Sequence, residues 1–353
     1  MIATRAPRRV LTAALALSLG VLAGCGGESD DVAASDGGEC GTDDLGTVSV
    51  GYFAVAPSAP VFLIAERLAE EHGFEVEMTP VPTGPEILTG VATGQYDVGN
   101  PGMGAYVYNA HADGLPFDLV SYQHIDTPEN LWFLSSQVAA TQEEATELGN
   151  DLSALADQSF ATVTPGGSTT YLLDQALEMG GLSIEDVSVE YMPFPDMLPA
   201  LTSGAIAGAT LPEPLLAAAE AQGIGFRAFP DQSAWGEPNI PSTVLAFNSD
   251  WSAEDPCLAE AYLTAFDAAT DEIREIGWDD PELLTILSEY TDLPEAALAS
   301  GVPSDMPEDL AVDFDVLQDM QEFFQRTDTL NYEELIDDEE LFDQELRDRV
   351  LGN

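Results

Sequence analysis

The chain of 353 residues contains no lysine: all nine of its basic side chains are arginines. Without lysine, a nucleotide-binding P-loop, a pyridoxal Schiff base and a lysine nucleophile are all excluded. Histidine is scarce as well, and the three histidines lack metal-ligand spacing. Neither a calcium loop of the D-x-D-x-D-G type nor a G-x-S-x-G serine elbow occurs. We therefore expect no enzymatic activity, no cofactor and no metal site.

Positive charge is correspondingly rare. Sixty-four acidic residues against nine arginines give a formal net charge of −55. Such a surface repels nucleic acid and anionic lipid headgroups, so we expect neither as a partner. Dense surface carboxylates instead favour an acidic, halophilic surface that stays hydrated in a salty or alkaline habitat.

The N-terminus resembles an export signal. Residues 1–24 have a basic start followed by an apolar run that is too short to span a membrane comfortably. The sequence LAGC, ending at Cys25, resembles a bacterial lipoprotein box, which implies cleavage before Cys25 and acylation of its thiol. An ordinary secretory signal is the alternative, and an arginine pair leaves open twin-arginine export. We expect an extracytoplasmic protein that is lipid-anchored to the cell membrane.

The segment after the signal is rich in glycine, serine and aspartate. Residues 25–46 have almost nothing to bury, so we expect a flexible acidic tether. Acylation of Cys25 leaves Cys40 and Cys257 as the remaining thiols in an oxidising compartment. A disulfide between them is the simplest prediction, and two unrelated thiols are the alternative.

The body alternates between strand and helix patterns. Residues 47–52 and 74–78 alternate like strands, and a helix is predicted from Pro60 to a stop at Gly73. A second helix follows from Pro85 and stops at Gly94. Strands separated by helices predict an α/β fold with mixed, mostly parallel sheets.

A similar order of elements recurs further along. The stretch ILTGVATGQYDVG at 87–99 has a counterpart in MLPALTSGAIAGA at 197–209. Few identities support this echo, and short helix–strand units can resemble each other by chance. The order of elements nevertheless predicts two similar lobes. Ligands of open α/β sheets bind at the carboxyl ends of the strands, so two facing lobes would enclose a cleft.

Four stretches carry a resemblance to a known family: GYFAVAPSAPVFLIAERLAEEHGFEVEM, ILTGVATGQYDVG, VTPGGSTTYLLDQALEMGGLSIEDVSVEYMPF and LTSGAIAGATLPEPLLAAAEAQG. In this order they resemble the substrate-binding proteins of ABC importers, in the branch of nitrate, sulfonate, taurine and thiamine-precursor binders. The resemblance covers about residues 47 to 345. It implies a periplasmic-binding-protein fold of type II, whose two lobes are joined by two crossovers.

The resemblance also implies boundaries and partners. Lobe I is expected at 47–125 and 242–353, lobe II at 126–241, and the crossovers near 123–131 and 236–243. The implied partners are a small-molecule ligand and a membrane permease with its ATPase, and we expect a monomer. A ligand-sensing lipoprotein that does not transport, or a binder of nitrate or another small anion, is the alternative.

One predicted ligand contact lies where VTPGGSTTYLLDQAL enters a helix. The backbone amides after Gly167, with the hydroxyls of Ser168 and Thr169, would suit an anionic or electron-rich group at a helix start. The matching turn contacts ligand in members of the family. The alternative is that either hydroxyl only caps its own helix.

The resemblance places further ligand contacts elsewhere. In the first lobe they are Phe53, Ala56, Pro57, Ser58 and Asn100. Glu213 occupies the Pro-Glu-Pro position of the family, and Trp235 is near a crossover. Aromatic faces with a carboxylate suit a flat, amine-bearing heterocycle such as a pyrimidine precursor, although each ring could instead pack in the core. A sulfonate or taurine-like ligand is the other candidate.

Overall fold

The structure is a computed structural model that describes residues 40, 44–126, 132–179, 181–228, 240–301 and 306–352. Residues 41–353 belong to one compact unit and residues 1–40 to another. The predicted signal peptide, Cys25 and Trp235 lie outside the described residues, as do residues 127–131 and 236–239 of the predicted crossovers.

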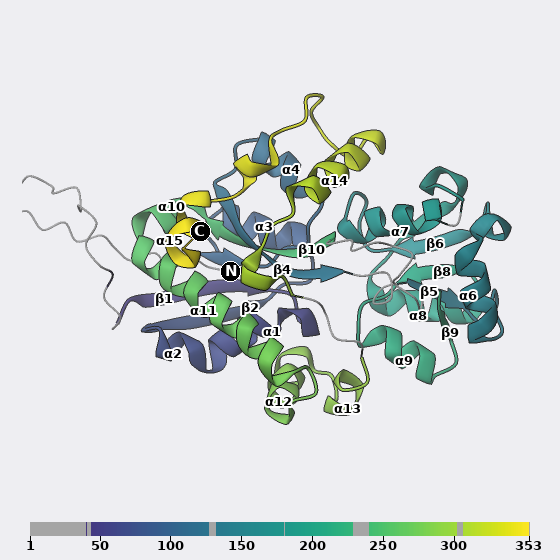
Figure 1. The fold of residues 1–353 in the computed structure, drawn as a ribbon, viewed down its shortest axis with the longest axis horizontal. Helices are drawn as coiled ribbons and strands as arrows, with labels where there is room; N and C mark the ends of the chain where they lie inside the picture. The colour runs from purple at the N-terminus through teal and green to yellow at the C-terminus, as the bar shows by residue number, and fades with distance from the viewer. Residues whose placement is uncertain are drawn as a thin grey trace, which may run out of the picture. The chain divides into compact units, whose positions relative to one another are not determined.

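The first sheet combines four strands from the N-terminal part of the body with β10, which follows the second sheet in the sequence (Figure 1). Its order is β2-β1-β3-β10-β4, with β1 (Gly46–Tyr52), β2 (Phe74–Pro80), β3 (Val98–Gly99), β4 (Phe117–Asp126) and β10 (Ile240–Asn248). Strand β1 is parallel to β2 and β3, whereas β10 is antiparallel to both of its neighbours, β3 and β4. Therefore β4 runs in the same direction as β1 and β3, and the carboxyl ends of these three strands share one edge.

The second sheet repeats this plan. Its order is β7-β6-β8-β5-β9, with β5 (Trp132–Ser135), β6 (Ser159–Thr162), β7 (Ser188–Tyr191), β8 (Gly208–Thr210) and β9 (Gly225–Arg227). Strand β6 is parallel to β7 and β8, and β5 is antiparallel to β8 and β9. The predicted α/β fold with two mixed sheets is confirmed. In each sheet one antiparallel strand, β10 or β5, lies between strands that run in a common direction. The exact lobe boundaries stay a prediction.

Helices flank both sheets (Figure 1). They are α1 (Ala59–Leu63), α2 (Ala69–Glu71), α3 (Gly84–Ala92), α4 (Ala105–Ala112), α6 (Gln142–Asn150), α7 (Ser168–Met179), α8 (Phe194–Ser203), α9 (Leu215–Ala221), α10 (Ser249–Glu254), α11 (Pro256–Ile276), α12 (Pro281–Thr291), α13 (Glu295–Leu298), α14 (Phe314–Arg326) and α15 (Gln344–Leu351). Short helical turns are η1 (Ala56–Ser58), η2 (Ile64–Leu68), η3 (Leu152–Leu155), η4 (Ile184–Asp186), η6 (Glu308–Leu310) and η7 (Asp338–Leu341). The helix predicted from Pro60 is formed by α1, η2 and α2, and Gly73 follows it with a φ of 79°.

Apolar side chains gather in three clusters. One packs α1, α11 and α12 against the first sheet, and another packs α8 and α9 against the second. The third contains residues of α3, α4, α7 and α14 together with strand residues of both sheets, such as Tyr122 and Phe160. Neighbouring residues of β5 separate between clusters, with Trp132 in the third and Phe133 in the second, as the alternation of side chains along a strand requires. This shared cluster fixes α7, whose first turn carries predicted ligand contacts.

Both cysteines that the structure describes are oxidised. Cys40 and Cys257 are each disulfide-bonded in the structure. That they are bonded to one another stays a prediction. Among the described residues, no helix is both long and apolar enough to cross a membrane.

Burial raises the pKa of Asp338, in η7, from its ordinary 3.8 to about 6, although Tyr108 and Gln321 offset part of the shift by hydrogen bonding. The folded state therefore holds this proton more tightly than the unfolded state. The resulting stabilisation is complete below about pH 4 and is lost as the pH rises through 6. The effect of Asp338→Asn on the free energy of unfolding should therefore be about 2 kcal/mol more favourable at pH 7 than at pH 4.

Urea unfolding of both proteins at each pH tests this difference. The exposed substitution Glu333→Gln is the control, because it removes the same charge without removing a buried carboxyl. If the change in free energy of unfolding caused by Asp338→Asn depends on pH no more than that caused by Glu333→Gln, burial does not raise the pKa of Asp338 as described.

Candidate ligand-binding site

Three predicted contacts meet at the carboxyl edge of the first sheet. Asn100 directly follows β3, is fully buried, and accepts a hydrogen bond on Oδ1 from the backbone N–H of Phe53 at 3.3 Å. Its Nδ2 donates to Oγ of Ser58 at 2.8 Å. Because Phe53 follows β1, this side-chain amide ties the ends of two strands to η1. The structure thus brings these residues together, and Asn100 positions the others.

The remaining predicted contacts of the first lobe, Ala56 and Pro57, lie in η1. Ala56 is half-buried and Pro57 is buried, and the carbonyl of Pro57 accepts a hydrogen bond from Nε2 of Gln123 at 3.0 Å. Gln123 lies near the end of β4, on the same sheet edge, and is fully buried. This residue was not predicted, because a lone glutamine in the strand FDLVSYQHID gives no signal of its role.

The turn before α7 differs from its prediction in one respect. The amide of Ser168 was expected to be available to a ligand, but it donates to the carbonyl of Met103 at 2.9 Å. The amide of Gly167 is also used, by the carbonyl of Thr164 at 3.1 Å. Within the described part of the chain, the amide of Thr169 has no hydrogen-bond acceptor. The expected cradle of amides is therefore reduced to one.

The two hydroxyls of this turn have different surroundings. Oγ1 of Thr169 lies 2.7 Å from Oγ1 of Thr162, the last residue of β6. Ser168 is buried, and its hydroxyl makes no hydrogen bond to any described residue. The hydroxyl of Thr210, at the end of β8, is likewise fully buried and unpartnered within the described residues. Ser168 and Thr210 therefore retain hydrogen-bonding capacity at the second sheet's edge.

A backbone contact joins the two edges. Gly104, which lies four residues after Asn100, forms a bridge with Gly167. The amide of Ala105 donates to the carbonyl of Gly166 at 2.7 Å, alongside the bond from Ser168 to Met103. The predicted contacts on the two sheets are thus linked through residues 100–105.

Glu213 is held by protein groups. Its Oε1 accepts from Arg227 at 2.6 Å and its Oε2 accepts from the amide of Ala217 at 3.1 Å. Arg227 also bonds Glu220 at 3.0 Å. Both carboxylate oxygens of Glu213 thus already have donors, so the geometry gives it a structural role at the start of α9. A direct role toward ligand stays a prediction.

Aromatic residues of β1, β5 and α7 pack mainly against other rings. Tyr52 meets Phe62 edge to face at 5.3 Å between ring centroids, and Trp132 meets Phe160 at 5.6 Å. Tyr171 packs on Phe323 of α14 at 5.4 Å. These three rings are buried in the core, whereas Phe53, which follows β1, is half-buried.

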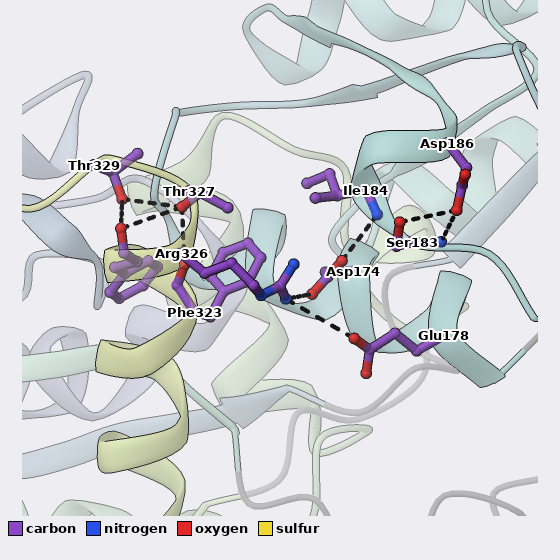
Figure 2. Close-up of polar contacts among 10 residues, drawn as sticks. Asp174, Glu178, Ser183, Ile184, Asp186, Phe323, Arg326, Thr327 and Thr329 are labelled. Atoms are coloured by element: carbon purple, nitrogen blue, oxygen red, sulfur yellow. Dashed lines mark hydrogen bonds and ion pairs between the residues drawn. The ribbon is translucent and has the colours of Figure 1, made fainter.

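Helix α7 is anchored by a buried carboxylate (Figure 2). Asp174 is fully buried, accepts a hydrogen bond from the amide of Ile184 at 2.9 Å, and forms an ion pair with Arg326 at the end of α14. The guanidinium also lies 5.2 Å from the ring centroid of Phe323 and 3.9 Å from a carboxylate oxygen of Glu178. This ion pair fixes the helix whose first turn contributes Ser168 and Thr169.

A hollow of about 900 Å³ lies elsewhere, and no predicted contact lines it. Its lining residues are Tyr122, Ile125, Arg274, Met306, Pro307, Glu308, Ala311, Val312, Asp313, Phe314 and Asp315. We place the candidate site at the two sheet edges instead, because the buried polar side chains converge there.

Two mixed sheets with flanking helices and polar side chains at the strand ends are the arrangement of periplasmic binding proteins. The chain belongs to the NMT1-like family, whose model matches residues 42–277. No curated protein sequence matches it.

Solved structures support the fold. A ligand-binding component of an ABC-type import system from Staphylococcus aureus, with zinc bound, is 15% identical over 86% of this chain and 98% of that one, with a TM-score of 0.69. The alkanesulfonate-binding protein SsuA from Xanthomonas axonopodis pv. citri, bound to MOPS, is 19% identical over 81% and 94%, with a TM-score of 0.63. The nitrate-binding protein NrtA from Synechocystis PCC 6803 is 18% identical over 86% and 84%, with a TM-score of 0.62.

Proposed function

We propose that this protein is the extracytoplasmic solute-binding subunit of an ABC importer. It captures a small organic ligand between the two sheet edges and delivers it to a membrane permease without changing it chemically. The ligand is a sulfonate of the taurine type or a pyrimidine of the thiamine-precursor type. The observation that carries this proposal is the direct link between the two edges, from Ser168 to Met103 at 2.9 Å.

Capture follows from this geometry. Ligand that contacts both edges stabilises the state in which they meet, since only differential affinity for that state shifts the equilibrium. The protein acts as a monomer, anchored through a lipid on Cys25, and the permease recognises the closed state. Membership of the NMT1-like family and the fold shared with binding components of import systems support this assignment.

A thermal-shift panel on the purified protein tests the function. Nitrate, taurine, alkanesulfonates and thiamine precursors are added separately in high salt. A ligand that binds only the folded state stabilises it by mass action and so raises the melting temperature. At a ligand concentration one hundred times the Kd, the free energy of unfolding rises by about 2.7 kcal/mol. Recovery of the ligand unchanged is expected, and its turnover would contradict a pure binding role.

A matched pair of serine variants locates the site. Ser168→Ala removes a hydroxyl of a buried residue that has no described partner, so it should weaken ligand binding while changing stability little. Ser203→Ala is the control, because that exposed hydroxyl only bonds the carbonyl of Ala200 at 3.0 Å. Equal ligand affinity in both variants would place the site elsewhere.

A further inference from the structure

One polar side-chain atom of Gln123 has no hydrogen-bond partner among the described residues, and it can be identified as the oxygen. A carbonyl oxygen only accepts hydrogen bonds, so the side-chain atom that lies 3.0 Å from the carbonyl of Pro57 must be Nε2. The other atom is therefore Oε1, which has no hydrogen-bond partner among the described residues although the side chain is fully buried. Buried polar atoms are nearly always paired. What is missing beside η1 is therefore a hydrogen-bond donor.

Another buried glutamine shows the usual state. Gln321, in α14, is also fully buried, and its Oε1 accepts from the amide of Ile336 at 2.8 Å and from the hydroxyl of Tyr332 at 3.0 Å. Its Nε2 donates to the carbonyl of Ile336 at 3.0 Å. Oε1 of Gln123 therefore lacks the two donors that Oε1 of Gln321 has.

Among the described residues, the candidate site has no uncommitted arginine or lysine that could bind an anion. Residues 41–353 contain six arginines and no lysine, and all six lie in the described part of the chain. Each has a partner: Arg67 pairs with Glu272, Arg227 with Glu213 and Glu220, Arg274 with Asp271, Arg326 with Asp174, Arg349 with Glu260, and Arg347 with the carbonyls of Val120 and Leu310. Every arginine of the body therefore already has a partner.

The start of α7 does not compensate for this. An anion at a helix start is held by several unused backbone amides. Here the amides of Gly167 and Ser168 donate to Thr164 and Met103, which leaves only that of Thr169. A ligand bound chiefly through negative charge would have to displace protein hydrogen bonds.

We infer that the ligand presents an amine or ammonium group to Oε1 of Gln123, and that the site selects amine-bearing ligands over plain anions. This inference rests on the proposed function and names the chemical group on which its selectivity depends. Nitrate and unsubstituted alkanesulfonates carry no hydrogen-bond donor, so neither can donate to Oε1 of Gln123.

Two pairs of probes that differ only in this group test the inference by titration calorimetry. In each pair the amine is replaced by a methyl group of similar size: taurine against propane-1-sulfonate, and 4-amino-5-hydroxymethyl-2-methylpyrimidine against 5-hydroxymethyl-2,4-dimethylpyrimidine. We expect at least one amine-bearing probe to bind, at least tenfold more tightly than its methyl analogue. Equal or tighter binding of the methyl analogue overturns the inference.

Variants of the two buried glutamines identify the residue. Gln123→Met should abolish the tenfold preference for the amine-bearing probe over its methyl analogue. Gln321→Met is the matched control, since it should reduce stability while keeping the tenfold preference. A preference that survives Gln123→Met overturns the assignment to this side chain.

The outcomes separate this inference from the proposed function. If nitrate or propane-1-sulfonate binds and neither amine-bearing probe does, the inference is wrong and the protein is still a solute-binding protein. If none of these probes and nothing in the wider panel binds, both are wrong.

Discussion

Replacing Arg326 by methionine is expected to lower the free energy of unfolding by about 3 kcal/mol, because it leaves the carboxylate of Asp174 buried without its cation. For a chain of this length the melting temperature should fall by about 4 °C. Methionine keeps an unbranched side chain over Phe323, so the effect reports on charge more than on packing. Thermal and urea unfolding measure it.

Two further variants make this result specific. Asp174→Asn combined with Arg326→Met removes both charges and should recover part of the loss. Arg349→Met removes an ion pair with Glu260 whose two side chains are 47% and 28% exposed, so it should cost at most about 1 kcal/mol. Similar losses for Arg326→Met and Arg349→Met would show that the buried carboxylate does not depend on Arg326.

Gly104→Ala is expected to break the link between the sheet edges. An added Cβ would lie 2.7 Å from the carbonyl oxygen of Gly166 and 3.2 Å from Cα of Gly167, and both are backbone atoms that cannot rotate away. The bonds from Ala105 to Gly166 and from Ser168 to Met103 should be lost as the loop moves out. We expect a loss of stability of about 3 kcal/mol and at least tenfold weaker ligand binding.

Gly102→Ala is the matched control in the same loop. There the nearest atom to an added Cβ is the carbonyl oxygen of Ser242 at 3.4 Å, which is close to an ordinary contact. This variant should stay within about 1 kcal/mol of the unsubstituted protein. Equal effects of the two substitutions on urea unfolding and calorimetric titration would mean that the link at Gly104 contributes nothing particular.

The strand ends of the first sheet could be predicted because local patterns define them. Alternating residues mark β1, and the predicted stop at Gly73 has the left-handed backbone that ends a helix. The glycine pair before α7 was also recognised, and α7 begins at Ser168. These features depend on a few neighbouring residues, so one sequence contains enough information to place them.

Contacts between distant segments were not predictable in the same way. The carbonyl that occupies the amide of Ser168 belongs to Met103, and main-chain atoms leave no trace in residue identity. Arg347 lies in a charged helical tail, yet it is buried and donates to the carbonyl of Val120. The role of Gln123 depends on which side of β4 faces η1, which an irregular strand register conceals.

The position of β10 constrains the order in which the first sheet can assemble. Strand β4 ends at Asp126, but its partner β10 begins only at Ile240, after every strand of the second sheet. A chain that emerges from the ribosome N-terminus first can therefore complete the second sheet while β3 and β4 still have unpaired edges. Such edges invite pairing with other chains. A nascent chain halted before β10 should consequently be the species most in need of a chaperone.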